Sequence, residues 1–163
     1  MNFEDLPIAR QDGTAPMWLK RLGVFITSTG EDCIKPHDVK EVRGERGILD
    51  VYGHEFHTIE RTSTMRIPAK IIECVMEENK TRGKIFRLTA EGLLGHGKKT
   101  MDGVDAGLLI HAASFPYQLS GCLAPGRIIL TTGVGESRGA MADIFTALGG
   151  FGAGRKVLLN VLN

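Results

Sequence analysis

The chain has 163 residues, of which 42% are hydrophobic and 24% charged, with a formal net charge of +1. These values predict one soluble globular domain, and they exclude a global field that would favour nucleic acid or an anionic membrane. No apolar run reaches the ~20 residues that span a bilayer, and the N-terminus lacks the features of a signal peptide. We therefore expect synthesis in the cytoplasm of the producing cell, with incorporation into a virion or release on lysis as later destinations.

The first 47 residues predict an arm, a strand and a loop. Residues 1–17 are rich in turn-forming residues and are expected to form an N-terminal arm, leaving residues 18–163 as a single β-rich domain. Apolar side chains in the arm offer a contact with the domain itself or with a second copy in a homo-oligomer. The β-branched and aromatic residues of segment 22–29 predict a strand, and the charged segment 31–47 predicts an exposed loop.

Two hairpins are expected in the middle of the chain. Segment 47–63 divides at Gly53 into two short strands, and segment 67–92 divides at the turn-forming stretch 79–83. A glycine-broken connection over 93–107 leads to a short buried strand at 108–112, and segment 127–133 predicts another strand.

The C-terminal part contains the one predicted helix, over 137–150, and a final strand over 155–163. Ser137 is the expected N-cap, and Gly149 is the expected C-terminal glycine. One apolar face is predicted from Met141, Ile144, Phe145 and Leu148. Seven or eight short strands with one helix predict a β-sandwich or a partly open barrel with the helix packed on it.

The residue types that hold metals are poorly placed for a site. The three cysteines, Cys33, Cys74 and Cys122, are widely spaced and odd in number, which argues against a disulfide framework and a structural zinc site. His54 and His57 lie three apart on a predicted strand and so point to opposite faces. We therefore expect neither a metal nor a cofactor.

Chemistry is suggested instead by the connection 107–126, "GLLIHAASFPYQLSGCLAPG", which carries His111 and Cys122. An imidazole within hydrogen-bond reach of a cysteine takes its proton and holds the thiolate as an ion pair. The turn of Ser120 and Gly121 offers backbone N–H groups for a developing oxyanion. The other interpretation is that the cysteine is a small buried apolar residue and the histidine a satisfied core residue.

The motifs of the chain resemble, in order, a family of small phage and prophage proteins of unknown function. The segments that carry the resemblance are "TIER" at 58–61, "IPAK" at 67–70, "IHAAS" at 110–114, "SGCLAPG" at 120–126 and "ESRGAM" at 136–141. The resemblance covers roughly residues 22–161. It implies a role as a virion component.

The histidine and Gly-Cys pair is also similar to the catalytic signature of the L,D-transpeptidases, peptidoglycan cross-linking enzymes with a β-rich YkuD-type fold. This resemblance implies that His111 is the base, Cys122 the nucleophile, and Gly121 with Cys122 part of the oxyanion site. Ser114 and Tyr117 on the same connection are expected to orient the imidazole or contact substrate.

The chain departs from the transpeptidase pattern after the cysteine, where Ala124 stands at the position of an arginine. Arg127 follows three residues later and is expected to bind substrate. Two functions follow. The first is a cysteine-dependent acyl-transfer or peptide-hydrolysing enzyme acting on peptidoglycan peptides. The second is a virion structural or assembly protein that keeps the fold without the chemistry and contacts other virion proteins.

Overall fold

The computed structural model describes residues 8–9, 15–28, 42–62, 67–89, 98–99, 105–106, 108–119 and 122–162. The elements in chain order are β1 (Met17–Ser28), β2 (Val42–Val51), β3 (His54–Arg61), β4 (Ile71–Asn79), β5 (Gly83–Leu88), β6 (Lys98–Lys99), β7 (Asp105–Ala106), β8 (Leu109–Ile110), the 3₁₀ turn η3 (Pro116–Gln118), β9 (Leu123–Gly126), β10 (Ile128–Leu130), β11 (Gly133–Gly135), α1 (Ser137–Ala147) and β12 (Lys156–Leu162).

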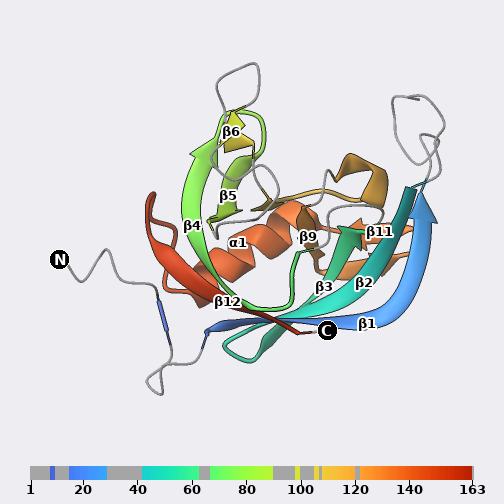
Figure 1. Ribbon diagram of the computed structural model, residues 1–163, viewed down its shortest axis with the longest axis horizontal. Coiled ribbons are helices and arrows are strands. Elements are labelled where there is room, and N and C mark those ends of the chain that lie inside the picture. Colours follow the sequence, from blue (N-terminus) through green and yellow to red (C-terminus); the bar gives the residue numbers. More distant parts are fainter. Residues whose placement is uncertain are drawn as a thin grey trace.

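Eight strands close into a barrel in the order β1-β12-β4-β5-β8-β9-β3-β2 (Figure 1). Two pairings, β1 with β12 and β8 with β9, are parallel, and the other barrel pairings are antiparallel. The predicted β-rich class with one helix is confirmed. Of the two expected architectures, the structure has the barrel, and the barrel is closed.

Both predicted hairpins are present, and their turn residues explain where they bend. Tyr52 and Gly53 between β2 and β3 both have positive φ, 50° and 88°, as a tight two-residue turn requires. Between β4 and β5, the Asn79 side chain accepts hydrogen bonds from the backbone N–H groups of Thr81 and Arg82. These bonds hold the backbone of Arg82 in the turn.

The loop predicted over 31–47 is wrong for residues 42–47, which form the first half of β2. They pair antiparallel with β1, and Glu45 is buried. The glycines that suggested a loop allow close packing instead. A Cβ on Gly44 would lie 2.5 Å from a side-chain carbon of Pro116, and one on Gly47 would lie 2.7 Å from the Thr58 hydroxyl.

Strand β1 begins five residues earlier than predicted. Met17 starts the strand and is fully buried, and Ala15 before it is buried as well. The last residues of the expected arm therefore pack into the domain. Ile8 forms an isolated parallel bridge with Val157 of β12, and the residues before it lie outside the described part of the chain.

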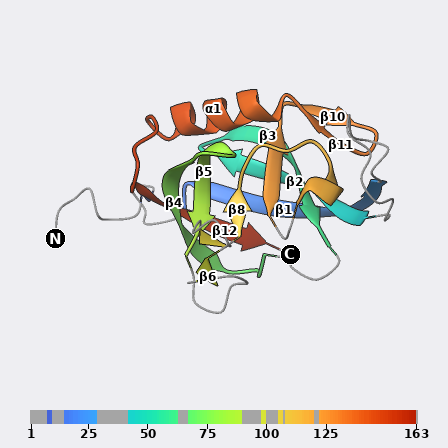
Figure 2. The ribbon, with the colours of Figure 1, turned by 90° about the horizontal axis from the view of Figure 1, so that it is seen from above.

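The helix α1 covers the barrel core. It crosses the ring of barrel strands in Figure 1, and Figure 2 shows that it lies over one side of that ring. The four predicted apolar residues of the helix are all buried, and the Phe145 ring stacks on Phe86 of β5 at 4.6 Å between centroids. Gly149 ends the helix with a φ of 90°, as predicted.

The predicted N-cap is wrong. Glu136, with a left-handed φ of 54°, occupies that position, and Ser137 is the first helical residue. The Ser137 hydroxyl donates a hydrogen bond to the Pro125 carbonyl at 2.5 Å and accepts one from the Ala113 N–H at 3.1 Å. Because it is used in these two bonds, the hydroxyl fastens the helix start to β9 and to the segment after β8.

A second apolar cluster lies on the side of the barrel wall away from this main core. It consists of Ile59, Ile85, Leu109, Leu119, Cys122, Ala124 and Val134. Leu119, just after η3, and Val134 of β11 come from outside the barrel, so the chain between β8 and β9 and the β10–β11 ribbon cover this patch of the wall. The backbone N–H of Val134 donates to the Ser114 carbonyl at 2.9 Å and joins the two covering segments.

Candidate functional site

The parallel pairing of β8 with β9 brings the two expected catalytic residues onto neighbouring strands. Ile110 pairs with Leu123, and the His111 N–H donates to the Leu123 carbonyl at 3.0 Å. His111 directly follows β8, and Cys122 directly precedes β9. The two residues therefore lie on adjacent backbone segments.

The Cys122 side chain is not open to solvent. Cys122 is only 3% exposed and belongs to the apolar cluster on the outer barrel wall, which contains Leu119 and Val134 of the covering segments. Ser120 and Gly121, the expected turn of the oxyanion site, lie outside the described residues. The side chain of this cysteine lies among aliphatic ones.

His111 is 2% exposed, and both of its ring nitrogens have partners. Nδ1 lies 3.0 Å from the Ala112 carbonyl oxygen, and Nε2 lies 2.6 Å from Nη1 of Arg82. Because a guanidinium group only donates, Nε2 is the acceptor and Nδ1 carries the hydrogen. The arrangement therefore fixes a neutral imidazole in one tautomer.

The electrostatics agree with this tautomer. Burial lowers the pKa of His111 to about 4; the hydrogen bond to Ala112 opposes the shift, and the Arg82 charge adds to it. His111 is thus neutral near pH 7, which is the form that a general base needs. Its lone pair, however, is already used to hold Arg82.

The two residues expected beside the histidine lie in the covering segment. The N–H of Ser114 donates to the Gln118 side chain at 2.8 Å, and its carbonyl accepts from Val134. Tyr117 lies in η3, and its side chain is outside the described part of the structure. The backbone of Ser114 therefore helps to hold the segment that covers the apolar cluster on the outer barrel wall.

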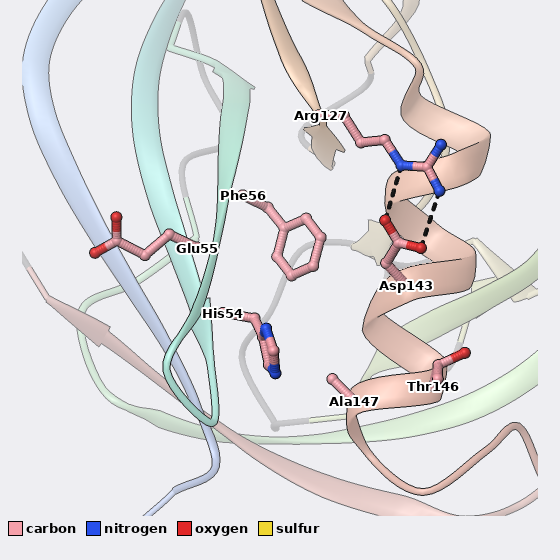
Figure 3. A pocket seen from close by; sticks show the side chains of 7 residues that line it. All are labelled: His54, Glu55, Phe56, Arg127, Asp143, Thr146 and Ala147. Carbon is pink, nitrogen blue, oxygen red and sulfur yellow. Dashed lines mark hydrogen bonds and ion pairs between the residues drawn. The ribbon is translucent and has the colours of Figure 1, made fainter.

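Arg127, the expected substrate-binding arginine, lines a cavity of about 450 Å³ between the start of β3 and α1. Its Nε and Nη2 donate to the two carboxylate oxygens of Asp143 at 2.8 and 2.9 Å (Figure 3). A second carboxylate, that of Glu136, lies 3.9 Å from Nη1. The hydrogen bonds with Asp143 raise the pKa of Arg127 and lower that of Asp143.

In Figure 3 the side chains of His54 and Phe56 point toward the helix, whereas Glu55 points away from it. The charge of Arg127 is balanced by acidic neighbours on the same wall of the cavity. An incoming anion would meet a guanidinium whose Nε and Nη2 already donate to Asp143. This cavity therefore has little net attraction for an anionic substrate.

A second cavity, of about 380 Å³, lies between the β4–β5 turn and α1, and the sequence did not indicate it. It is lined by Thr81, Arg82, Gly83, Lys84, Ala112, Arg138, Met141, Ala142 and Phe145. Three of these side chains are cationic, and no carboxylate is among them. The residues come from three segments, and consecutive segments lie about 25 positions apart in the sequence. No local sequence motif therefore predicts the cavity.

Comparison of the chain with protein-family models, curated proteins and solved structures finds no match. Among the residues that the structure describes, no three metal-ligating side chains come together. The same part of the chain has no helix long and apolar enough to cross a membrane. The features of the described residues that bear on function are the two cavities and the histidine–cysteine pair.

Proposed function

We propose that the protein is a structural or assembly protein of a phage particle. In this proposal the chain keeps the fold and the His111–Cys122 pair but does not use the pair for catalysis. The observation that carries the proposal is the state of the pair: Cys122 is packed among aliphatic side chains, and both ring nitrogens of His111 have partners. In this role the two residues stabilise the junction of β8 and β9.

Catalysis would need the opposite arrangement. A thiolate is the reactive form of cysteine, and burial in apolar surroundings disfavours the charged thiolate. The nucleophile must also reach an acyl carbon, and its base must have a free lone pair. The aliphatic packing of Cys122 and the Arg82 contact of His111 each oppose one of these requirements.

An exposed strand edge gives the assembly role a surface. Strand β12 pairs with β1 only at residues 17–20, so within the described part of the chain residues 24–28 of β1 pair with β2 alone. Val24 and Phe25 on this stretch are 48% and 47% exposed. An unprotected edge carrying apolar side chains is a common place for another chain to add a strand. The proposed partner is another protein of the particle.

A second function, the cysteine-dependent acyl-transfer or peptide-hydrolysing enzyme acting on peptidoglycan peptides, is favoured by one specific observation. His111 and Cys122 lie on hydrogen-bonded neighbouring strands, and His111 is neutral. For this function, Arg82 must leave Nε2 and the segment covering Cys122 must move. Both events would be triggered by the substrate.

One assay separates the two functions. The purified protein is incubated with muropeptides, and products are sought by mass spectrometry, with Cys122→Ala as the paired variant. The structural role predicts no cross-linked or shortened peptide from either protein. Products that form with the native protein and disappear in Cys122→Ala would replace the structural role by the enzymatic one.

A second assay tests the assembly surface. Val24→Lys places a charge on the exposed edge, and we expect it to lower the amount of the protein recovered in purified particles. Ile71→Lys is the control for an exposed apolar residue elsewhere on the barrel, because Ile71 is 60% exposed and pairs with Asn160 of β12. Equal recovery of both variants, with unchanged melting temperatures, would remove β1 as the assembly surface.

A further inference from the structure

We propose that the cavity between the β4–β5 turn and α1 binds an amphipathic organic anion, a carboxylate or phosphate group joined to a small apolar group. The inference goes beyond either function above and does not depend on the choice between them. It rests on the arrangement of charge and apolar surface around this cavity.

Three cations meet at the rim. Arg82 and Lys84 come from the β4–β5 turn and the start of β5, and Arg138 comes from the first turn of α1. Within the described residues, none of the three forms an ion pair with a carboxylate. Glu78 lies opposite Lys84 in the strand register, but the two side chains do not pair within 4 Å. The rim therefore carries an uncompensated positive charge, unlike the cavity at Arg127.

Arg82 is held in place before any ligand arrives. Asn79 accepts hydrogen bonds from the Thr81 and Arg82 backbone N–H groups, and the neutral His111 accepts one from Nη1 of Arg82 at 2.6 Å. A guanidinium has five N–H donors, so donors remain for an oxyanion after one is used by His111. Pre-organised charge of this kind loses little entropy when it binds a ligand.

The other lining residues favour an apolar group attached to the anion. Met141 and Phe145 of α1 line the cavity and are otherwise buried in the core. Lys84 lies over the Phe151 ring, with Nζ 4.9 Å from the centroid, and this contact holds its ammonium group in place. A volume of about 380 Å³ is within the range of small-molecule sites and leaves room for a ligand of a dozen or more non-hydrogen atoms.

The test is a titration of the full-length protein with three probes: N-acetyl-leucine, the matched neutral N-acetyl-leucinamide, and phenyl phosphate. Binding is followed by backbone-amide NMR shifts and by calorimetry. We expect saturable shifts at the β4–β5 turn and the first two turns of α1, with the carboxylate bound at least about tenfold more tightly than the amide, since charge-assisted hydrogen bonds are lost with the amide. The ratio between the carboxylate and the phosphate identifies which anionic group the site prefers.

Variants of two of the three cations test whether the positive charge is responsible for binding. Arg138→Gln and Lys84→Gln are each expected to weaken carboxylate binding by about threefold to tenfold, while Lys80→Gln, an exposed lysine of the same turn that does not line the cavity, leaves it unchanged. Equal affinity for the acid and the amide would overturn the proposal. So would equal weakening by Lys80→Gln, or the absence of saturable binding for all three probes in a protein whose NMR spectrum shows it folded.

Discussion

The ion pair between Arg21 and Glu60 crosses from β1 to β3, and its replacement gives a sharp test of the barrel. The Arg21 guanidinium donates to both carboxylate oxygens of Glu60 at 2.9 Å and also to the Ile67 carbonyl. The two side chains are 2% and 3% exposed. Glu45, also buried, lies opposite Glu60 in the strand register. Arg21→Met would therefore leave the buried Glu60 carboxylate without this cation.

Breaking a buried ion pair by removing one partner typically costs 3–5 kcal/mol, so we expect the free energy of unfolding to fall by about 4 kcal/mol. With an m value of about 2 kcal/mol/M in urea, the midpoint would move down by about 2 M. The matched control is Arg87→Met. Arg87 pairs with Glu77 at 2.7 Å, but these side chains are 26% and 33% exposed, and a pair of this kind contributes at most about 1 kcal/mol.

Urea unfolding at pH 7, followed by fluorescence and circular dichroism, measures both variants. If Arg21→Met and Arg87→Met lower the midpoint equally, the Arg21–Glu60 pair is hydrated and the barrel wall is not closed there. Because Arg21→Met alone also changes packing, the double variant Arg21→Met with Glu60→Leu is informative. It should recover most of the loss, since an apolar pair avoids the buried unpaired charge.

Three further outcomes follow from single side chains. Burial lowers the pKa of His111 to about 4, so between pH 6.5 and 4 the unfolded chain binds a proton at this histidine and the folded protein does not. The free energy of unfolding should therefore fall by about 3 kcal/mol as the pH drops through this range. An NMR titration midpoint near 6.5 for His111 would contradict this expectation. Met141→Asp, which buries an unpaired charge beneath α1, should lower the free energy of unfolding by several kcal/mol, and an unchanged melting temperature would show that the helix face is misplaced. Gly133→Ala would place a Cβ 1.8 Å from the Ser114 carbonyl oxygen and should cost at least about 2 kcal/mol in calorimetry; a neutral effect would mean that the covering segment is not docked on β11.

The sequence predicted the local elements well, because their signals lie within a few residues. Gly53 marks the β2–β3 turn, and the spacing of Met141, Ile144 and Phe145 marks the buried helix face. It failed at β2, where Gly44 and Gly47 suggested a loop. Those glycines are needed because Pro116 and Thr58, distant in sequence, pack against them.

Barrel closure depends on the parallel pairing of β1 with β12, which joins residues about 140 positions apart. No local pattern carries such information. The candidate site was likewise predictable only in its local features. The stretch with His111 and Cys122 could be singled out from the sequence alone. The burial of the sulfur, and the Arg82 side chain that comes to His111 from a turn 29 positions earlier, depend on long-range packing.

The most direct measurement is the alkylation rate of Cys122 in the native protein between pH 6 and 10, resolved by peptide mass spectrometry. Cys74 in the same sample is the internal reference, because it is fully buried in the core and burial raises its pKa. We expect Cys122 to react as slowly as Cys74, far below a free thiol, at every pH. Rapid labelling of Cys122 below pH 7 that is abolished in His111→Ala would contradict the account and make the pair a catalytic one.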